Sequence, residues 1–347
     1  MLELKHRAMA CDFVVLVPDE NQRVGNRSVA DVVLRHLESI EEIERALTVY
    51  RDDSEIARIN ALAFEQAVHV KPATFDLLVK ANALAEKTKG AFDITAGPLV
   101  EIWGFTKREG RKPKPDVIEL ARSRVGWEQL LLDPRDRTVR FGVEGMALNL
   151  GAIGKGHAID VLAAAMRADG MHDFLIHAGH SSVLAAGNQQ PIEPSGGEQA
   201  VSDETDRNET SAQNSQAGPL DKPPTGWLVG VSHPTRPGRR LGGLWLRDEA
   251  LSTSGSGKQF FHHQGKRYGH VIDPRTGYPA GQWLSLTLTT SHAVDADALS
   301  TALFVMGNED AKAYAAEHGI GLILVGAGKR QDEVSIDKTG PLIWHDT

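Results

Sequence analysis

The sequence predicts a mixed α+β fold, and two kinds of pattern support this prediction. Apolar residues recur every three or four positions near the N-terminus, as one face of an amphipathic helix requires; they are Val29, Val32, Val33, Leu37, Ile40, Ile43 and Leu47. Beyond about residue 126, short β-type runs such as DFLIHAG, GWLVGVSH and LSLTLTTS dominate, interrupted by helical patterns at 155–168 and 295–306. These strands are too irregularly spaced for a doubly wound parallel sheet, and no GxGxxG follows the first strand. We therefore expect mostly antiparallel sheets with flanking helices.

Three further elements are predicted in the N-terminal half. Residues 1–17, MLELKHRAMACDFVVLV, end in a short apolar run that is typical of a first strand. One helix is expected at about 54–62. Another is expected at 73–89 and should end at Gly90, because glycine readily adopts the backbone conformation that stops a helix.

One segment differs from the rest in composition. Residues 189–224 are rich in Pro, Gly, Ser, Gln and Asn, with seven acidic residues against Arg207 and Lys222. Such a composition cannot bury enough apolar surface to fold, so we expect a disordered insertion within a single domain that spans 1–347. The strand-like runs on both sides favour an insertion at the turn of a hairpin. A linker between two domains is the alternative.

Charge and cysteine content exclude several classes of protein. The chain of 347 residues has 46 acidic and 38 basic residues, a net charge of -8 and no basic block, which argues against a nucleic-acid-binding protein. A single cysteine, Cys11, excludes an internal disulfide and a multi-cysteine zinc site. No apolar stretch approaches the roughly 18 to 20 residues of a membrane span. The N-terminus as written lacks a signal peptide, so we expect a cytoplasmic protein, or a periplasmic or membrane-associated one if the true start lies upstream.

Three glycine-rich loops are candidates for binding an anion. They are NLGAIGKGHAID at 149–160, STSGSGK at 252–258 and HVIDPRTGYP at 270–279. Glycine lets backbone N–H groups approach an anion closely, and a loop that opens onto a helix adds the positive end of the helix dipole. The first loop is therefore a candidate phosphate cradle. Neither lysine-containing loop is a Walker A motif, and tight turns are the alternative for all three.

Two further positions have side chains suited to chemistry. Asp297 and Thr301 are four residues apart on a predicted helix and share one face, so their oxygens could bind a hard cation such as Mg²⁺. The alternative is a solvated helix start with Asp295 or Asp297 near the favourable end of the dipole. His270 precedes a DPRTG turn that could hold its imidazole at the edge of a cleft, although a lone histidine is commonly structural.

Taken in order, the motifs resemble the ApbE family of FAD:protein FMN transferases over nearly the whole chain. The matching segments are TVYRDDSEIARIN at 48–60, GAFDITAGPLVEIWGF at 90–105, GAIGKGHAID, ALSTSG with HVIDPRTGYP, and DADALSTALFVMG. The resemblance implies an ApbE-like α+β fold that binds FAD in a cleft. It also implies transfer of FMN from FAD to a serine or threonine hydroxyl of an acceptor protein, with release of AMP.

Specific roles follow from the same resemblance. It implies that Mg²⁺ is held by Asp297, Thr301 and the carbonyl of Gly154. It implies that His270 helps the acceptor hydroxyl lose its proton and that Lys155 steadies the diphosphate. On this basis, Asp297→Ala is predicted to abolish Mg²⁺-dependent turnover and to leave folding intact.

The FAD site implied by the resemblance includes further residues. They are Met9, Tyr50, Phe92, Asp93, Gly151, Lys155, Thr253, Ser254, Gly255, His270, Asp273 and Thr276. Ordinary core packing is the alternative for the first four of these. Trp103 is equally consistent with a flavin contact and with packing.

Several positions depart from the family pattern. Asn149 stands where the family usually has Asp, and Gly179, His180 and Ser181 stand where it has GGD, so both changes remove a carboxylate. Ser256 replaces an acidic or amide residue often found after TSG. These changes keep two alternatives open, namely a FAD pyrophosphatase that yields FMN and AMP, and a non-catalytic FAD-binding protein.

The partner implied by the resemblance is an acceptor flavoprotein subunit that carries a serine or threonine flavinylation motif. Family members usually serve membrane-linked electron-transfer subunits. The chain has no acceptor motif of the Asp-Gly-x-Thr-Gly-Ala-Thr kind, so we do not expect it to be its own acceptor.

Overall fold

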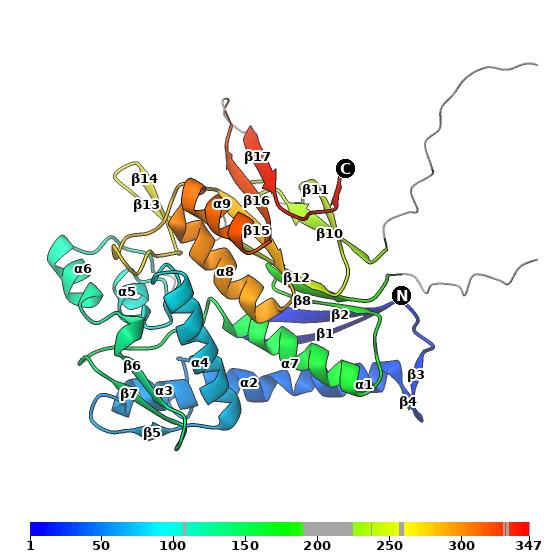
Figure 1. The fold of residues 1–347 in the computed structure, drawn as a ribbon, viewed down its shortest axis with the longest axis horizontal. Helices are drawn as coiled ribbons and strands as arrows, with labels where there is room; N and C mark the ends of the chain where they lie inside the picture. The colour runs from blue at the N-terminus through cyan, green and yellow to red at the C-terminus, as the bar shows by residue number, and fades with distance from the viewer. Residues whose placement is uncertain are drawn as a thin grey trace, which may run out of the picture.

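The computed structural model describes residues 1–106, 109–189, 225–236, 238–256, 260–328, 330 and 333–346. Its centre is an eight-stranded sheet in the order β1-β2-β8-β9-β12-β15-β16-β17 (Figure 1), and every neighbouring pair of strands is antiparallel. The strands are β1 (Leu2–Ala8), β2 (Cys11–Val17), β8 (Phe174–Ala178), β9 (Ser182–Ala186), β12 (Glu249–Gly255), β15 (Ser285–Thr290), β16 (Gly321–Ala327) and β17 (Val334–Thr339). The predicted α+β fold with mostly antiparallel sheets is confirmed.

The N-terminal segment forms a hairpin, so the prediction of one strand was wrong. Strand β1 pairs with β2, and Met9 and Ala10 make the turn with φ angles of 51° and 58°. Positive φ at both central residues matches the twist of a two-residue hairpin turn. In β1 the apolar residues alternate with charged ones, which is the pattern of a strand that is buried on one face.

Helices cover one face of the sheet. Helix α7 (Gly154–Ala168) lies against α8 (Ala293–Met306), and α8 packs on β12 and β15. The helix predicted for residues 29–47 is divided into α1 (Val29–Glu38) and α2 (Ile40–Leu47), although its apolar stripe faces the core as expected. At the break, Ser39 Oγ donates a hydrogen bond to the His36 carbonyl at 2.7 Å, a contact of the type that bends helices.

The other predicted helices are confirmed at their ends. Helix α3 (Glu55–Leu62) is capped by Ser54, whose Oγ accepts a hydrogen bond from the Ala57 N–H at 2.9 Å. Helix α4 (Pro72–Lys87) is followed by Gly90, whose φ is 73° and whose N–H donates to the Ala85 carbonyl. The remaining helical elements are α5 (Gly97–Ile102), α6 (Pro115–Arg122), α9 (Asn308–Glu317) and the short 3₁₀ turn η1 (Trp127–Gln129).

Small sheets surround the central one. Two of them have two strands each: β3 (Arg23–Val24) pairs with β4 (Arg27–Ser28), and β13 (Phe260–His263) pairs with β14 (Lys266–Gly269). Two have three strands each. One has the order β5 (Val68–His69), β7 (Thr138–Phe141), β6 (Leu130–Asp133), and the other has the order β10 (Trp227–Ser232), β11 (Arg240–Leu246), β18 (Trp344–His345).

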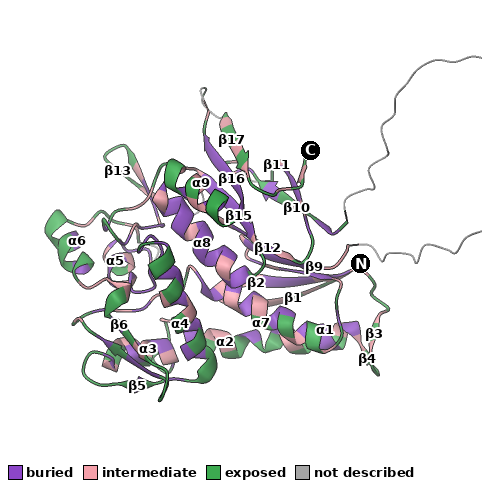
Figure 2. Ribbon diagram, in the orientation of Figure 1, coloured by how far each residue is buried: buried purple, intermediate pink, exposed green. Residues whose placement is uncertain are grey.

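The sheet that contains β10 covers the face of the central sheet opposite the helices. There Trp227, Val231 and Leu244 pack on apolar side chains of β8, β9, β12 and β16. The central strands are therefore buried on both faces, and all five residues of β9 are buried (Figure 2). Burial on both sides explains why these strands read as continuous apolar runs rather than alternating ones.

The predicted disordered insertion falls almost entirely on 190–224, outside the described residues, and stays a prediction. At its borders, the Gln189 N–H donates to the Gly226 carbonyl at 3.1 Å. Strands β9 and β10 belong to different sheets, so the hairpin expected between the flanking runs is not formed by those strands. Within the described residues, no helix combines the length and apolar character needed to cross a membrane.

Candidate active site

A cavity of about 1020 Å³ lies where the 91–106 segment, the central sheet and the β10 sheet meet. Its wall includes residues from the 91–106 segment, the loop before α7, the turn between β8 and β9, the end of β12 and the loop that follows β10. This volume is at the upper end of the range for small-molecule sites, so a ligand as large as a dinucleotide suits it.

The cavity brings together many of the residues predicted from sequence. Those that line it are Tyr50, Phe92, Asp93, Gly151, Thr253, Ser254, Gly255, His270 and Thr301. Six other predicted site residues are not among the described residues that line the cavity; they are Met9, Gly154, Lys155, Asp273, Thr276 and Asp297.

Asp297 is buried next to this cavity, where its carboxylate is the hub of a hydrogen-bond network, and it is not a solvated helix start. It is 4% exposed, and its carboxylate lies 3.2 and 3.3 Å from Lys155 Nζ. It also accepts hydrogen bonds from the Gly156 N–H at 3.1 Å, from Ser182 Oγ at 3.1 Å and from Ser252 Oγ at 3.4 Å. These partners belong to α7, β9 and β12, so a single carboxylate ties both helices to the sheet.

Thr301 connects this hub to the cavity wall. It lies one turn after Asp297 on α8, and its hydroxyl is 3.4 Å from the Asp297 carbonyl and 3.2 Å from Ser254 Oγ. Thr301 and Ser254 both line the cavity. The predicted shared face of Asp297 and Thr301 therefore places a carboxylate and a hydroxyl at the inner end of the site.

Close contact between α7 and α8 depends on the glycine at position 156. A Cβ atom there would lie 2.1 Å from the Ala293 carbonyl oxygen, so any side chain would push the helices apart. Asp160, on the same face of α7, accepts hydrogen bonds from the Ala293 and Val294 N–H groups at 2.8 and 2.9 Å. Its carboxylate therefore caps the N-terminus of α8, a contact between distant segments that was not predicted from the sequence.

The loop before α7 keeps its shape despite the Asn149 departure. Asn149 Oδ1 accepts a hydrogen bond from the Gly151 N–H at 2.9 Å, a bond that an aspartate oxygen would also accept. The substitution therefore removes a charge and retains the turn. Gly154 begins α7, and the Met9 methyl group lies 3.1 Å from where a Cβ on Gly154 would stand.

Asp93 fastens two segments beneath the cavity. It is 8% exposed and accepts hydrogen bonds from the Thr95 N–H at 2.8 Å, from Thr95 Oγ1 at 2.7 Å and from the Trp127 N–H at 3.0 Å. Burial raises the pKa of this carboxyl group, and the hydrogen bonds oppose that rise. Phe92 is 2% exposed and belongs mainly to the core.

The DPRTG turn is held by its own side chains. Asp273 accepts hydrogen bonds from the Arg275 N–H and Nε, both at 2.9 Å, and its carbonyl accepts one from the Gly277 N–H at 2.8 Å. Thr276 Oγ1 accepts one from the Tyr278 N–H at 3.3 Å. Asp273 and Thr276 thus shape the turn, while His270 at its start borders the cavity with its ring 6.4 Å from that of Phe105.

Trp103 packs in the core instead of lining the cavity. It is 0% exposed, its Nε1 donates to the Gly277 carbonyl at 2.9 Å, and its ring lies 5.5 Å from that of Tyr268. Of the two roles left open by the sequence, the structure supports packing.

The loop after β10 supplies cavity residues that were not predicted from the sequence. His233, Thr235 and Arg236 line the cavity, and His233 Nδ1 accepts a hydrogen bond from the Thr235 N–H at 3.3 Å. The segment GWLVGVSH was interpreted only as a strand. The HPTRPG run that overlaps its end has the proline and glycine content of a turn, and that signal could have identified an imidazole and a guanidinium at a strand end.

His180 occupies a backbone conformation that favours glycine. Its φ is 61°, it lines the cavity, and its ring stacks on that of His177 at 5.8 Å. Burial, together with the nearby His180, lowers the pKa of His177. The left-handed conformation costs about 1 to 2 kcal/mol for a residue with a Cβ, so this turn is strained.

We expect His180→Gly to raise the free energy of unfolding by about 1 kcal/mol, because glycine adopts this conformation without steric cost. Urea unfolding measures the change. His180→Ala is the matched control, since it removes the imidazole and keeps the Cβ, and it should give no such gain. Equal effects of the two substitutions would contradict the strain at this turn.

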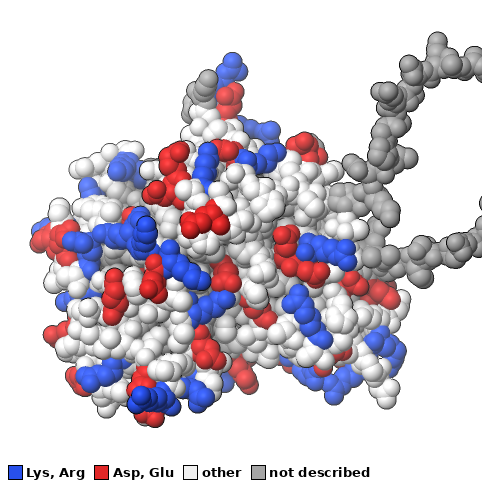
Figure 3. Space-filling view, in the orientation of Figure 1, with Lys and Arg blue, Asp and Glu red and all other residues white. Residues whose placement is uncertain are grey.

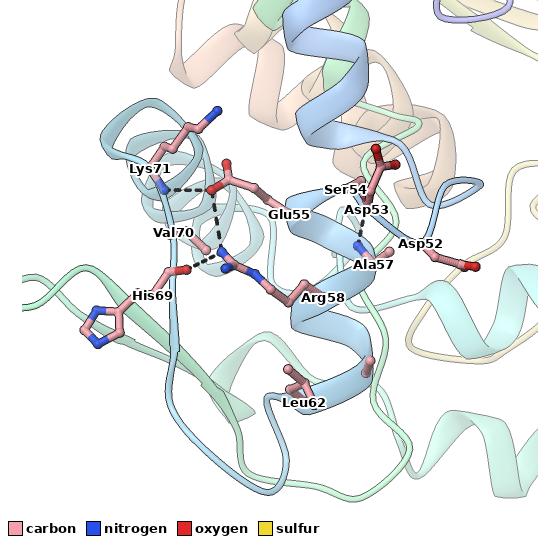
Figure 4. A pocket seen from close by; sticks show the side chains of 11 residues that line it. Asp52, Asp53, Ser54, Glu55, Ala57, Arg58, Leu62, His69, Val70 and Lys71 are labelled. Carbon is pink, nitrogen blue, oxygen red and sulfur yellow. Dashed lines mark hydrogen bonds and ion pairs between the residues drawn. The ribbon is translucent and has the colours of Figure 1, made fainter.

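A second cavity, of about 850 Å³, lies beside α3 (Figure 4). Its polar groups satisfy one another: Glu55 accepts a hydrogen bond from the Lys71 N–H at 2.9 Å and pairs with Arg58, which donates to the His69 carbonyl. It contains none of the residues that the motifs single out as site residues, so the candidate site is the first cavity.

Comparison with known proteins identifies the family of this chain. The model of the ApbE family matches residues 14–324. A FAD:protein FMN transferase of Treponema pallidum is 30% identical over 299 residues, covering 84% of this chain and 76% of the relative. A FAD:protein FMN transferase of Klebsiella pneumoniae is 27% identical over 288 residues, covering 81% of this chain and 73% of the relative.

Solved structures show the same fold. The crystal structure of the ApbE protein from Thermotoga maritima has a TM-score of 0.75 and 29% identity, and the match covers 95% of this chain and 97% of that one. The flavin transferase ApbE from Vibrio cholerae has a TM-score of 0.76 and 24% identity, with coverage of 97% and 96%. On the family match over most of its length, this chain belongs to the ApbE family.

Proposed function

We propose that this chain transfers FMN from FAD to a serine or threonine hydroxyl of an acceptor protein and releases AMP. The observation that carries the proposal is the cavity that joins His270, the 253–255 segment and Thr301 beside the buried Asp297. The relatives named FAD:protein FMN transferase support it.

The reaction needs a base, an exit for AMP and stabilisation of charge. The acceptor oxygen bonds to the FMN-side phosphorus, the bond from that phosphorus to the bridging oxygen breaks, and AMP leaves with the electron pair. We assign the removal of the hydroxyl proton to His270, which lies at the cavity wall. Lys155 and the N–H groups of the loop before α7 balance the negative charge of the diphosphate.

The chemistry of three oxygen donors supports a Mg²⁺ site beside the cavity. The Asp297 carboxylate, the Thr301 hydroxyl and the Gly154 carbonyl are hard oxygen donors, the kind that Mg²⁺ prefers. When bound there, Mg²⁺ would neutralise charge on the diphosphate during transfer. The Asp297 carboxylate is oriented by hydrogen bonds from Ser182, Ser252 and the Gly156 N–H. Its charge is also paired with the Lys155 ammonium group.

The walls of the cavity suit the two halves of FAD. Tyr50, which is 70% exposed, lines it together with Phe105 and offers a flat surface to an isoalloxazine ring. The loop after β10 presents His233 and Arg236 to the same cavity, groups suited to the phosphate and hydroxyls of the AMP half.

Incubation with FAD and Mg²⁺, with and without a peptide that carries the motif Asp-Gly-x-Thr-Gly-Ala-Thr, tests the proposal. AMP and the mass of the peptide are followed. A gain of one FMN that is lost without Mg²⁺ is the expected result. AMP and free FMN without labelling would favour the pyrophosphatase, and FAD binding with neither product would favour a flavin-binding protein.

A further inference from the structure

Two segments lead outward from the cavity near His270. The first follows Phe105 and Thr106, which line the cavity. The second is the β13–β14 hairpin, which ends at Gly269, directly before His270. We call residues 109–114 and 260–269 together the rim.

The two parts of the rim lie against each other, because a Cβ atom on Gly110 would stand only 2.4 Å from Cδ1 of the Phe261 ring. Phe261 lies 5.9 Å from the Phe105 ring and stacks on Tyr268 at 5.4 Å. Lys112 Nζ and Lys266 Nζ lie 5.9 and 5.5 Å from the centre of the Tyr268 ring, one from each part of the rim. The two parts of the rim are therefore in contact, and an exposed lysine from each part lies within 6 Å of the centre of the same ring.

The rim is locally basic in a chain of net charge -8. Its cations are Arg111, Lys112, Lys114, Lys266 and Arg267, against the single carboxylate of Glu109. The first four are exposed, and no ion pair joins them to a carboxylate of the described residues. Lys80 and Lys312, by contrast, pair with acidic side chains. Over the region of α5 and α6, Figure 3 shows both basic and acidic side chains, so the positive charge is a property of the rim alone and not of the whole face.

An acceptor protein has to cover this edge of the cavity if its hydroxyl is to reach the FMN phosphorus beside His270. Exposed cations that outnumber the carboxylates beside them create a positive potential that attracts an oppositely charged surface. Resting on the proposed transferase function, we propose that the rim binds an acidic segment of the acceptor protein next to its modified serine or threonine.

Two peptides test this recognition. Both carry the motif Asp-Gly-x-Thr-Gly-Ala-Thr, flanked in one by four glutamates and in the other by four glutamines. We expect the acidic peptide to have a KM lower by on the order of fivefold at low salt, because exposed ion pairs are individually weak. The difference should shrink as ionic strength rises. The double variant Lys112→Glu/Lys266→Glu should erase or reverse it and leave kcat for the glutamine peptide unchanged.

The double variant Arg135→Glu/Arg140→Glu is the matched control. It makes the same change in net charge at two exposed positions, one in the turn between β6 and β7 and one in β7. These strands lie away from the rim (Figure 1). The control variant should therefore keep the preference for the acidic peptide. Melting temperatures of both double variants show that any change is not unfolding.

The results distinguish a failure of the proposed function from a failure of the rim proposal. If the unaltered protein labels neither peptide, the proposed function fails and the rim proposal falls with it. If it labels both with equal KM, the transferase stands and the rim proposal is overturned. If the rim variant keeps the peptide preference but loses binding to vesicles of anionic phospholipid, the rim recognises a membrane instead of an acceptor.

Discussion

Replacing Asp297 with asparagine is expected to lower Mg²⁺-dependent FAD turnover by about 100-fold or more, the scale of several kcal/mol of lost charge stabilisation. Asparagine keeps the size of the side chain and one acceptor oxygen, but it removes the charge that a divalent cation and Lys155 both need. AMP release over a series of Mg²⁺ concentrations measures the effect.

Asp295→Asn is the matched control for this prediction. Asp295 precedes Asp297 by two residues on α8 and pairs with Lys80 at 3.0 Å near the surface. Its loss removes the same charge without touching the hub, so turnover should stay near that of the unaltered protein. If Asp297→Asn turns over FAD within a few-fold of the rate of the unaltered protein, Asp297 is not a Mg²⁺ ligand.

Asp297→Ala is less informative about the metal than Asp297→Asn, because we expect it to affect folding as well. The sequence had predicted that folding would stay intact. It leaves Lys155 opposite no carboxylate and deprives the Gly156 N–H, Ser182 and Ser252 of their acceptor. Removing one partner of a buried pair costs about 3 to 5 kcal/mol, and the lower end applies because Lys155 is partly exposed. We expect Asp297→Ala to lose stability as well as activity.

Local patterns in the sequence predicted the elements whose causes are local. The Ser54 cap and the Gly90 stop act within one turn of their helices, so the ends of α3 and α4 were predictable. The break at Ser39 was not predicted, although Ser39 and Glu42 have the S-x-x-E spacing that is typical of a helix start. The hydroxyl bond from Ser39 to His36 shows only in the structure. The β1–β2 hairpin turns at Met9 and Ala10, neither of which is a typical turn residue.

The candidate site shows the same division. Motif order placed His270, Asp297 and Thr301, and the structure puts them at one cavity or next to it. The hydroxyls that orient Asp297 come from strands 115 and 45 residues away in sequence, at Ser182 and Ser252. Only the pairing of β9 with β12 brings them to one place, so no local pattern could reveal them.

Trp103→Ala is expected to be among the most destabilising substitutions around the cavity, with a loss of about 3 to 5 kcal/mol in the free energy of unfolding. The side chain is 0% exposed and contacts the rings of Phe261, Tyr268 and Tyr278 at 6.2, 5.5 and 6.0 Å. Removing the indole leaves a void between α5 and the 268–278 segment. Urea unfolding monitored by circular dichroism measures the loss.

Trp103→Phe separates ring packing from the hydrogen bond. Phenylalanine keeps an aromatic ring in the cluster but leaves the Gly277 carbonyl without the Nε1 donor, which should cost about 1 to 3 kcal/mol. Because the cluster holds the segment that contains His270 and the DPRTG turn, the alanine variant should also raise the KM for FAD more than the phenylalanine variant does. Weaker FAD binding with an unchanged free energy of unfolding in both variants would instead mean that the indole contacts the flavin, and the packing role would be wrong.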